Sequence, residues 1–214
     1  MIEQIKFMKP FVIGICGGSG SGKTTLLKKI SSHFGSDNVS VFSMDNYYHP
    51  IEQQQKDKNG IVNFDLPTAL DEQKLSSDLA NLVSGETVQV KEYFFNSPPD
   101  KNVLLTIAPK KIIIVEGIFL FHYVQVNQML DFSIFVDVDL ETQLDRRIYR
   151  DQESRGYDES DIIYQWNNHV TPCFKNYIEP FKEQSSFIYR NDKNSEKDFA
   201  SLMETLSEKT MIIK

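Results

Sequence analysis

The sequence predicts an α/β fold in which a parallel central sheet is flanked by helices. Short, almost continuously apolar runs alternate with longer amphipathic stretches, a pattern typical of strands buried on both faces and of helices that cover them. The composition, 40% hydrophobic and 25% charged over 214 residues, suits one globular domain with a sizeable core. Because the chain contains no internal repeat and no linker-like segment, a single domain over residues 1–214 is expected.

The elements follow in order along the chain. Strands are predicted at 11–16, 39–43, 112–115 and 132–138. Helices are predicted at 23–34, 71–83, 140–155, 158–169 and 195–209. Two segments, 47–63 and 88–107, break this rhythm and are expected to form hairpins or loops on the functional rim of the sheet.

Charge and cysteine content exclude several classes of protein. A net charge of -7 argues against general binding to a nucleic acid polymer or to an acidic membrane, since both require a broad basic field. The first residues, MIEQIKFMKP, lack the apolar stretch of a signal peptide or membrane span, so a cytoplasmic location is expected. Two cysteines, Cys16 and Cys173, form neither a disulfide framework nor a zinc site, and we expect reduced thiols in packed positions.

A glycine-rich motif follows the first predicted strand and directly precedes the first predicted helix. The stretch GGSGSGKTT matches the phosphate-binding loop (P-loop) pattern G-x-x-x-x-G-K-[ST]. Its glycines let successive backbone N–H groups surround phosphate oxygens, and the helix N-terminus adds partial positive charge. Lys23 supplies a mobile cation, and Thr24 can ligate Mg²⁺. A nucleoside triphosphate is therefore the expected ligand, held by Gly17, Gly18, Ser19, Gly20, Ser21, Gly22, Lys23, Thr24 and Thr25.

A kinase is favoured over a GTPase-type switch. The chain lacks the guanine-reading N-K-x-D segment, and its D-x-x-G string, Asp57 to Gly60, falls in a polar loop. The second predicted strand instead delivers Asp45, in VFSMD, just beyond its carboxyl end, on the rim that carries the P-loop. Asp45 could orient and deprotonate an attacking hydroxyl; the alternative is a helix N-cap or turn aspartate.

A second carboxylate follows another buried strand. The run IIIVEG ends in Glu116, one position beyond the apolar residues and beside the P-loop. A carboxylate there can act on Mg²⁺ through water. The predicted metal site thus comprises Thr24, Asp45 and Glu116.

Arginines cluster in the helix predicted at 140–155. Four of the five arginines fall within ten positions, and Asp139 and Gly156 can cap this helix at its two ends. Arginine side chains bind phosphate bidentately and can stabilise charge on a transferred phosphoryl group. The segment is therefore predicted to form a lid in which Arg150 and Arg155 are catalytic. The alternative is surface ion pairing with Glu141, Asp145, Asp151 and Glu153, which is expected for Arg146 rather than for Arg150 or Arg155.

The sequence resembles the uridine–cytidine kinase family over nearly its whole length. The matching segments, in order, are GICGGSGSGKTT, FSMDNYY, NFDLPTALD, TVQVKEYFF, IIIVEGIFLF, FVDVDLETQLDRRIYRDQESRG, VTPCFKNYIEPF and FIYRN. The resemblance implies a P-loop NTPase fold with a five-stranded parallel core sheet, a β-hairpin at about 86–108 over the substrate pocket, and a helical arginine lid at about 140–160. It also implies ATP- and Mg²⁺-dependent phosphorylation of the 5′-hydroxyl of uridine or cytidine, giving UMP or CMP in pyrimidine salvage.

The resemblance also assigns roles residue by residue. It implies that Asp45 engages the 5′-hydroxyl, that Asp65 accepts from the ribose hydroxyls, and that Arg150 and Arg155 contact phosphate. The remaining implied nucleoside contacts are Tyr48, Phe64, Tyr93, Phe95, Arg147 and Gln165, and the adenine-side loop contains Arg190 and Asn194. For Tyr48 and Phe95 the residues alone leave core packing as an equal alternative.

Two departures from the family pattern concern base recognition. Pro98 stands where the family commonly has a histidine that reads the polar edge of the pyrimidine, with Asp100 nearby in place of an arginine, and Tyr157 replaces another arginine. Because proline cannot donate that hydrogen bond, the base specificity is left open. The candidates for a substitute reader are His49, His122, His169 and Asn96, whereas His33 is expected at a helix end.

Three functions are therefore weighed. The first is a kinase that transfers phosphate from ATP, or alternatively GTP, to a pyrimidine ribonucleoside. The second is a related P-loop kinase for another hydroxylated metabolite, such as a phosphopentose or nicotinamide riboside. The third is a nucleotide-binding regulatory protein that transfers nothing. The family is often oligomeric, so a homo-oligomer is an open expectation.

Overall fold

The core of the protein is a five-stranded, fully parallel sheet. In this computed structural model, which describes residues 9–94 and 103–211, the strand order is β2-β5-β1-β6-β7. The strands are β1 (Phe11–Cys16), β2 (Val39–Ser43), β5 (Ile112–Glu116), β6 (Phe132–Asp137) and β7 (Phe187–Arg190). This confirms the predicted α/β fold with a five-stranded parallel sheet.

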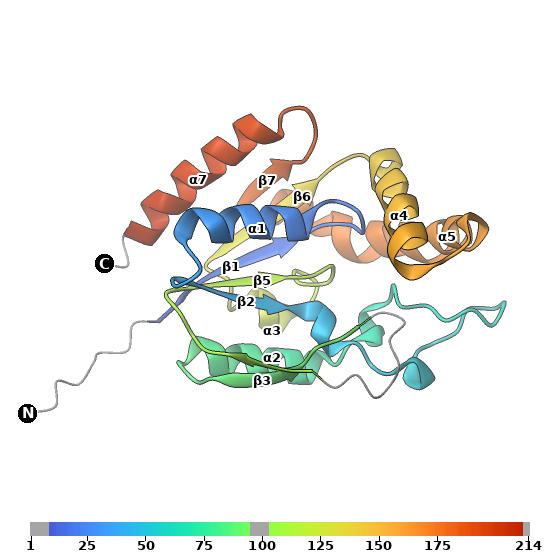
Figure 1. Cartoon of the computed structure of the whole chain (residues 1–214), viewed down its shortest axis with the longest axis horizontal. Helices are drawn as coiled ribbons and strands as arrows, with labels where there is room; N and C mark the ends of the chain where they lie inside the picture. The colour runs from blue at the N-terminus through green and yellow to red at the C-terminus, as the bar shows by residue number, and fades with distance from the viewer. Residues whose placement is uncertain (1–8, 95–102, 212–214) are drawn as a thin grey trace, which may run out of the picture.

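Helices cover both faces of the sheet and its carboxyl edge (Figure 1). One face carries α1 and α7, the other carries α2 and α3, while α4 and α5 lie beyond the carboxyl ends of the strands. The helices are α1 (Lys23–Phe34), α2 (Glu72–Val83), α3 (Val124–Asn127), α4 (Leu140–Arg155), α5 (Glu159–Gln165), α6 (Thr171–Cys173) and α7 (Ser195–Met211).

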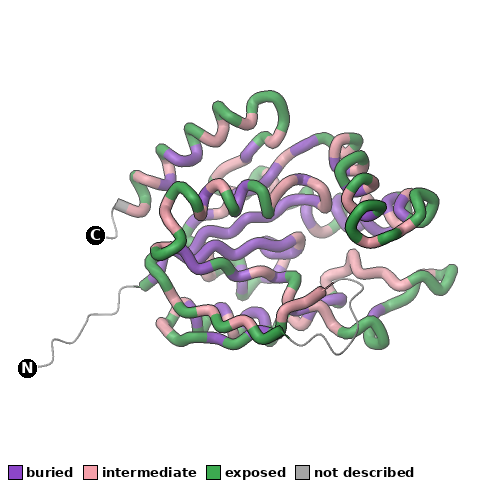
Figure 2. The backbone as a smooth tube through the Cα atoms, viewed as in Figure 1, coloured by how far each residue is buried: buried purple, intermediate pink, exposed green. Residues whose placement is uncertain are grey.

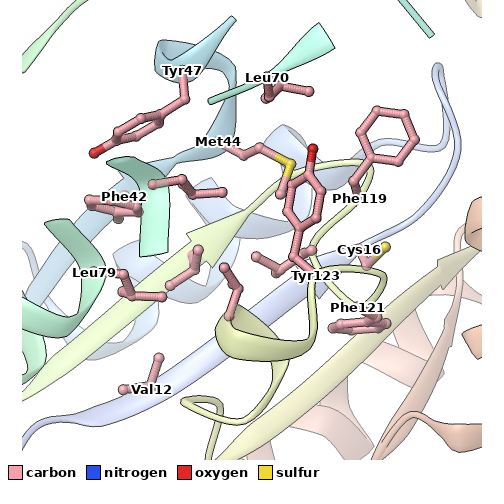
Figure 3. Packing of buried hydrophobic residues seen from close by; sticks show 14 of the residues in the cluster. Val12, Cys16, Phe42, Met44, Tyr47, Leu70, Leu79, Phe119, Phe121 and Tyr123 are labelled. Atoms are coloured by element: carbon pink, nitrogen blue, oxygen red, sulfur yellow. The ribbon is translucent and has the colours of Figure 1, made fainter. Parts of the chain in front are cut away.

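Alternation along the strands produces two apolar cores. On β5, Ile113 and Val115 face the core beneath α2, shown in part in Figure 3, whereas Ile112 and Ile114 face the core beneath α1 and α7. All five residues of β5 are buried, so the sheet interior forms the continuous buried region of Figure 2. Burial on both faces explains why these strands are recognisable as unbroken apolar runs.

A separate antiparallel hairpin lies beside α2. It consists of β3 (Val88–Lys91) and β4 (Leu104–Ile107), with Val88 opposite Ile107. An antiparallel pair thus lies within the segment 86–108, while its place over a substrate pocket stays a prediction, and its tip, with Phe95, Asn96, Pro98 and Asp100, lies outside the described residues.

The segment after the lid departs from the expected helix at 158–169. Helix α5 ends at Gln165 and continues into a π-helical turn, Trp166–Val170, then α6 and a second π-helical turn, Phe174–Ile178. Pro172 supplies a physical reason, because it has no N–H to donate to the carbonyl four residues earlier and so interrupts the regular ladder.

Two further expectations can be compared with the fold. Cys16 and Cys173 are buried free thiols, as predicted. None of the helices within residues 9–94 and 103–211 combines the length and apolar character needed to cross a bilayer.

Candidate active site

A cleft of about 810 Å³ opens at the carboxyl edge of the sheet. P-loop residues form one wall, strand-end carboxylates the floor, and α4, α5 and the loop before α2 the remaining walls. The predicted site residues that line it are Ser19, Gly20, Gly22, Lys23, Thr24, Thr25, Asp45, Tyr48, Phe64, Asp65, Glu116, Arg147, Arg150, Arg155 and Gln165. Segments as far apart as residues 19 and 165 therefore meet in one cavity.

The P-loop has the backbone form that its sequence predicts. Gly22 adopts a left-handed conformation, with φ of 99°, immediately before α1 begins at Lys23. The Lys23 ammonium donates to the carbonyl oxygens of Gly17 and Gly18, each at 3.0 Å. The lysine thus closes the loop over its own backbone, at the place where phosphate oxygens can take over as acceptors.

Helix α4 packs directly on the P-loop through polar groups. Its fully buried residues, Gln143, Arg147 and Asp151, lie four apart on one face. A Cβ at Gly18 would approach the Gln143 Oε1 atom to 2.1 Å, and one at Gly20 would approach the Gln143 carbonyl oxygen to 2.4 Å. The close approach of helix and loop therefore requires glycine at Gly20, where the clash is with backbone, whereas at Gly18 it is with the end of the Gln143 side chain.

Three arginines converge on the carboxylate of Asp151, which is only 1% exposed. Arg150 Nε and Arg155 Nη1 approach its Oδ1 at 2.8 and 3.2 Å, and Arg147 Nε approaches Oδ2 at 3.3 Å. Arg147 also donates to Ser19 Oγ at 3.0 Å and to Gln165 Oε1 at 3.1 Å. Because three cations share one anion, this end of the cleft carries local positive charge within an acidic protein.

The ion pairs expected for the arginines of α4 are not the ones that the structure contains. Arg146 was expected to form surface ion pairs, but its guanidinium donates to the carbonyls of Gly20, Ser21 and Asn191 at 3.2–3.4 Å. Arg150 and Arg155, for which ion pairing was not the expected role, both pair with Asp151, as Arg147 does. The reason is helical geometry, since Arg146 points at the P-loop while the other two flank the buried carboxylate.

Two carboxylates lie at the floor of the cleft. Glu116 ends β5 and accepts from Ser43 Oγ at 2.7 Å. Ser43, not Asp45, caps the 3₁₀ turn Met44–Tyr47, so the Asp45 carboxylate is directed to the cleft and the N-cap alternative is wrong.

The surroundings raise the pKa of both carboxylates above their ordinary values. Desolvation is the largest cause for Asp45, although its side chain stays open to the cleft, and Lys23, Arg155 and Arg150 oppose the shift. Burial is also the largest cause for Glu116, followed by the Asp45 charge, with Lys23 and Ser43 opposing. The two acids therefore share an electrostatically unfavourable position that a bound cation would relieve.

The donor chemistry at this floor fits Mg²⁺ held together with phosphate. Thr24, Asp45 and Glu116 offer one hydroxyl and two carboxylates to the same cleft. Over the described part of the chain, no group of three or more His, Cys, Asp or Glu side chains could hold a metal alone. Mg²⁺ is usually held by one or two carboxylates supplemented by water and substrate phosphates.

Aromatic and polar side chains form the far wall, away from the P-loop. The Tyr48 ring packs edge-on against Phe64, with centroids 6.1 Å apart, and lies 5.3 Å from the Tyr93 ring. Tyr48 is half-buried and also lines the cleft, so its ring packs against neighbouring aromatic rings and forms part of the cavity surface. Desolvation raises the pKa of Asp65 in this wall, while Arg147, His169, Arg150 and Arg155 oppose it.

The two residues predicted for the adenine-side loop are not among the cleft-lining residues described. Arg190 and Asn194 are exposed, with backbone N–H groups bonded to Asp198 and Asp192. The adjacent Asn191 is the residue that reaches the P-loop, donating to the Ser21 carbonyl at 2.6 Å.

The four histidines of the chain lie in different parts of the structure. Among them only His169 is one of the cleft-lining residues described. His122 packs against Tyr177 and Phe181, and exposed His33 sits in the last turn of α1, as expected.

Gln143 and Asn191 were missed from the sequence, and Asp151 was named there only as an alternative surface ion-pair partner. A signal for Gln143 and Asp151 was present, because Gln143, Arg147 and Asp151 form an i, i+4, i+8 polar series within a single predicted helix. The helix buries these polar residues instead of apolar ones, which an apolar periodicity search does not detect. For Asn191 the sequence contained no comparable signal.

Comparison with known proteins decides the family. The model of the Phosphoribulokinase / Uridine kinase family matches residues 12–195. The chain belongs to this family. It is 33% identical over 179 residues to the uridine kinase of Brevibacillus brevis, covering 84% of each chain. It is 34% identical over 194 residues to uridine kinase-like protein 3 of Arabidopsis thaliana, but spans 41% of that protein's length.

Solved structures support the fold of this phosphoribulokinase/uridine kinase family member. Phosphoribulokinase from Rhodobacter spheroides aligns with a TM-score of 0.64 over 85% of this chain and 70% of its own, at 15% identity. The prediction of a phosphotransferase that acts on a hydroxyl group is confirmed at the level of the family.

The buried Asp151 carboxylate yields a stability prediction for this family member. Asp151→Asn should lower the free energy of unfolding by about 3 kcal/mol, because it leaves three guanidinium groups without their shared anion. Urea unfolding checks this, with Glu153→Gln, an exposed carboxylate on the same helix, as the matched control. Equal stability of the two variants would show that Asp151 does not anchor the lid arginines.

The raised carboxylate pKa values predict a pH dependence. In the folded protein the pKa values of Asp45 and Glu116 lie above their ordinary values of 3.8 and 4.5. The protonated carboxyl groups therefore contribute their full stabilisation below the ordinary pKa values, and this stabilisation is lost as the pH rises through the folded-state pKa values. Asp45→Asn and Glu116→Gln should therefore be more stable than the wild type at pH 7 and lose this advantage towards pH 3. Urea midpoints measured across this range test it, with exposed Asp37→Asn as control. A constant difference at all pH values would contradict the assignment.

Proposed function

We propose that the protein transfers the γ-phosphoryl group of ATP to the 5′-hydroxyl of a pyrimidine ribonucleoside, forming UMP or CMP from uridine or cytidine. One observation carries the proposal: Asp45, Tyr48, Phe64, Asp65, Arg147 and Gln165, the nucleoside set implied by family resemblance, line the same cleft as the P-loop. The relatives named uridine kinase point to the same acceptor. A role in pyrimidine salvage follows from this reaction.

On the donor side, the P-loop amides and Lys23 would hold the triphosphate. Lys23 already donates to two loop carbonyls, so its ammonium exchanges those acceptors for phosphate oxygens when the nucleotide enters. Arg150 and Arg155 border the same cavity and are held by Asp151 within reach of it. They would stabilise the charge that spreads over the transferred phosphoryl group.

On the acceptor side, Asp45 would align the 5′-hydroxyl and take its proton. The raised pKa of Asp45 suits this task, because it makes the carboxylate a stronger base than an aspartate with the ordinary pKa. Asp65 would accept from the vicinal ribose hydroxyls, and Tyr48 and Phe64 would contact the ring. In this way the oxygen nucleophile is positioned against the phosphoryl group, the main source of catalysis in such reactions.

Thr24, Asp45 and Glu116 would hold Mg²⁺ alongside the phosphates. Bound there, Mg²⁺ would supply positive charge that neutralises the charge developing on the phosphates. Glu116 is fixed for this role by the hydroxyl of Ser43, and its neighbour Asp45 reaches the same floor of the cleft.

An assay with purified protein tests the proposed acceptor. Mg-ATP is supplied with uridine, cytidine, purine nucleosides, ribulose 5-phosphate, nicotinamide riboside or no acceptor, and ADP release is measured. Release that depends on uridine or cytidine supports the proposal. Release only with another acceptor, or none with any, overturns it. Replacing ATP with GTP in the productive reaction defines the donor.

Asp45→Asn provides the mechanistic prediction. Turnover should fall by about 100-fold or more, the usual scale of general-base catalysis, because the amide cannot take the hydroxyl proton. The affinity for ATP should change little, as measured by isothermal titration calorimetry of the free enzyme. Near-normal turnover would remove Asp45 from the reaction, whereas loss of ATP binding would place its role on the donor side.

A further inference from the structure

A cluster of four polar side chains on the far wall has no part in the chemistry proposed above. It joins the D-x-x-G loop to the segment after α5 and consists of Asp57, Asn59, Tyr164 and His169. Asp57 Oδ2 accepts from the Tyr164 hydroxyl at 2.7 Å and contacts His169 Nε2 at 2.8 Å. We call this set the Asp57 latch, because its partners are more than 100 residues apart in the chain.

The loop side of the latch is internally ordered. Asp57 Oδ1 accepts from the backbone N–H groups of Asn59 and Ile61 at 2.8 and 3.0 Å, and Asn59 Nδ2 donates to the Tyr164 hydroxyl at 2.6 Å. One carboxylate thus shapes the turn and attaches it to the facing wall. The Tyr164 hydrogen bond is the largest cause that holds the pKa of Asp57 below its ordinary value, and the His169 contact acts in the same direction.

The helix side depends on the π-helical turn Trp166–Val170. In an α-helix, residues five apart point about 140° away from each other, whereas the wider π turn brings them towards one face. Tyr164 and His169 are five apart, and their rings meet edge-on with centroids separated by 5.9 Å. The irregular turn therefore aligns both donors on Asp57, and the side chain of His169 is 2% exposed as a result.

Both ends of the latch lead directly to residues of the acceptor site. On the loop side, Asn63 N donates to the Gln55 carbonyl and Asp65 N donates to Asn63 Oδ1 at 2.9 Å, so the turn is continuous with Asp65. On the helix side, Gln165 adjoins Tyr164 and accepts from Arg147, which in turn donates to Ser19 of the P-loop.

We propose that Asp57, Tyr164 and His169 are positioning residues for the acceptor site: they hold the loop that bears Phe64 and Asp65 at a fixed separation from Gln165 and Arg147. This inference rests on the proposed function, because it assigns Asp65 and Gln165 to the nucleoside. The bonds of the latch join the loop that leads to Asp65 with the helix that carries Gln165, so weakening them should impair acceptor binding and spare nucleotide binding.

Steady-state kinetics of three variants test the proposal. Tyr164→Phe and His169→Leu each remove one donor to Asp57 and should raise the nucleoside KM about 10-fold, with the ATP KM within about twofold of wild type. His169→Gln keeps an N–H donor and should retain a KM near that of the wild type. Tyr149→Phe, at an exposed tyrosine of α4, is the matched control. An unchanged nucleoside KM in Tyr164→Phe, or an equal rise in both KM values, overturns the proposal.

Hydrogen exchange separates this proposal from the proposed function. The amides of Asn59 and Ile61 should exchange faster in Tyr164→Phe than in Tyr149→Phe, whatever acceptor the enzyme uses. If the wild type phosphorylates no nucleoside, the proposed function fails, and the latch is then judged by this measurement alone. Equal exchange in the two variants would show that the latch does not hold the loop and would overturn it.

Discussion

The single carboxylate of Asp151 is the constraint on which the cleft depends. It is buried, and it fixes three guanidinium groups that would otherwise repel one another and turn to solvent. One of them, Arg147, extends the network to Ser19 in the P-loop and to Gln165 after the lid helix. A buried charge is costly unless it is paired, so the position of α4, the direction of the arginines and the shape of the cleft are set together.

Charge is segregated across the cleft. Positive groups occupy the P-loop and α4, while Asp45, Glu116 and Asp65 face them from the strand ends and from the loop before α2. The carboxylates show elevated pKa values because desolvation outweighs the attraction of the nearby cations. This explains how a chain with a net charge of -7 can still attract an anionic ligand, since local fields in a concave site outweigh the average over the surface.

The sequence predicted most of the elements because the physics that forms them is local. Both ends of β1, α1, β2 and α4 were located correctly, and Asp139 and Gly156 cap α4 as expected. Strand β7, short and only partly buried, lacks the continuous apolar run of the others, and only family resemblance implied it. The Asp57 latch and the contacts of Arg146 and Asn191 join distant segments through polar groups, and such pairings leave no periodicity in a single chain.

The face that α4 presents to the P-loop has a consequence for motion. An element that leaves its seat exposes the surface it had buried, and an exposed apolar surface invites association with other molecules. Here the buried stripe consists of an amide, a guanidinium and a carboxylate, all of which water solvates well. Separation of α4 from the P-loop would therefore expose polar groups that water solvates, and not an apolar surface.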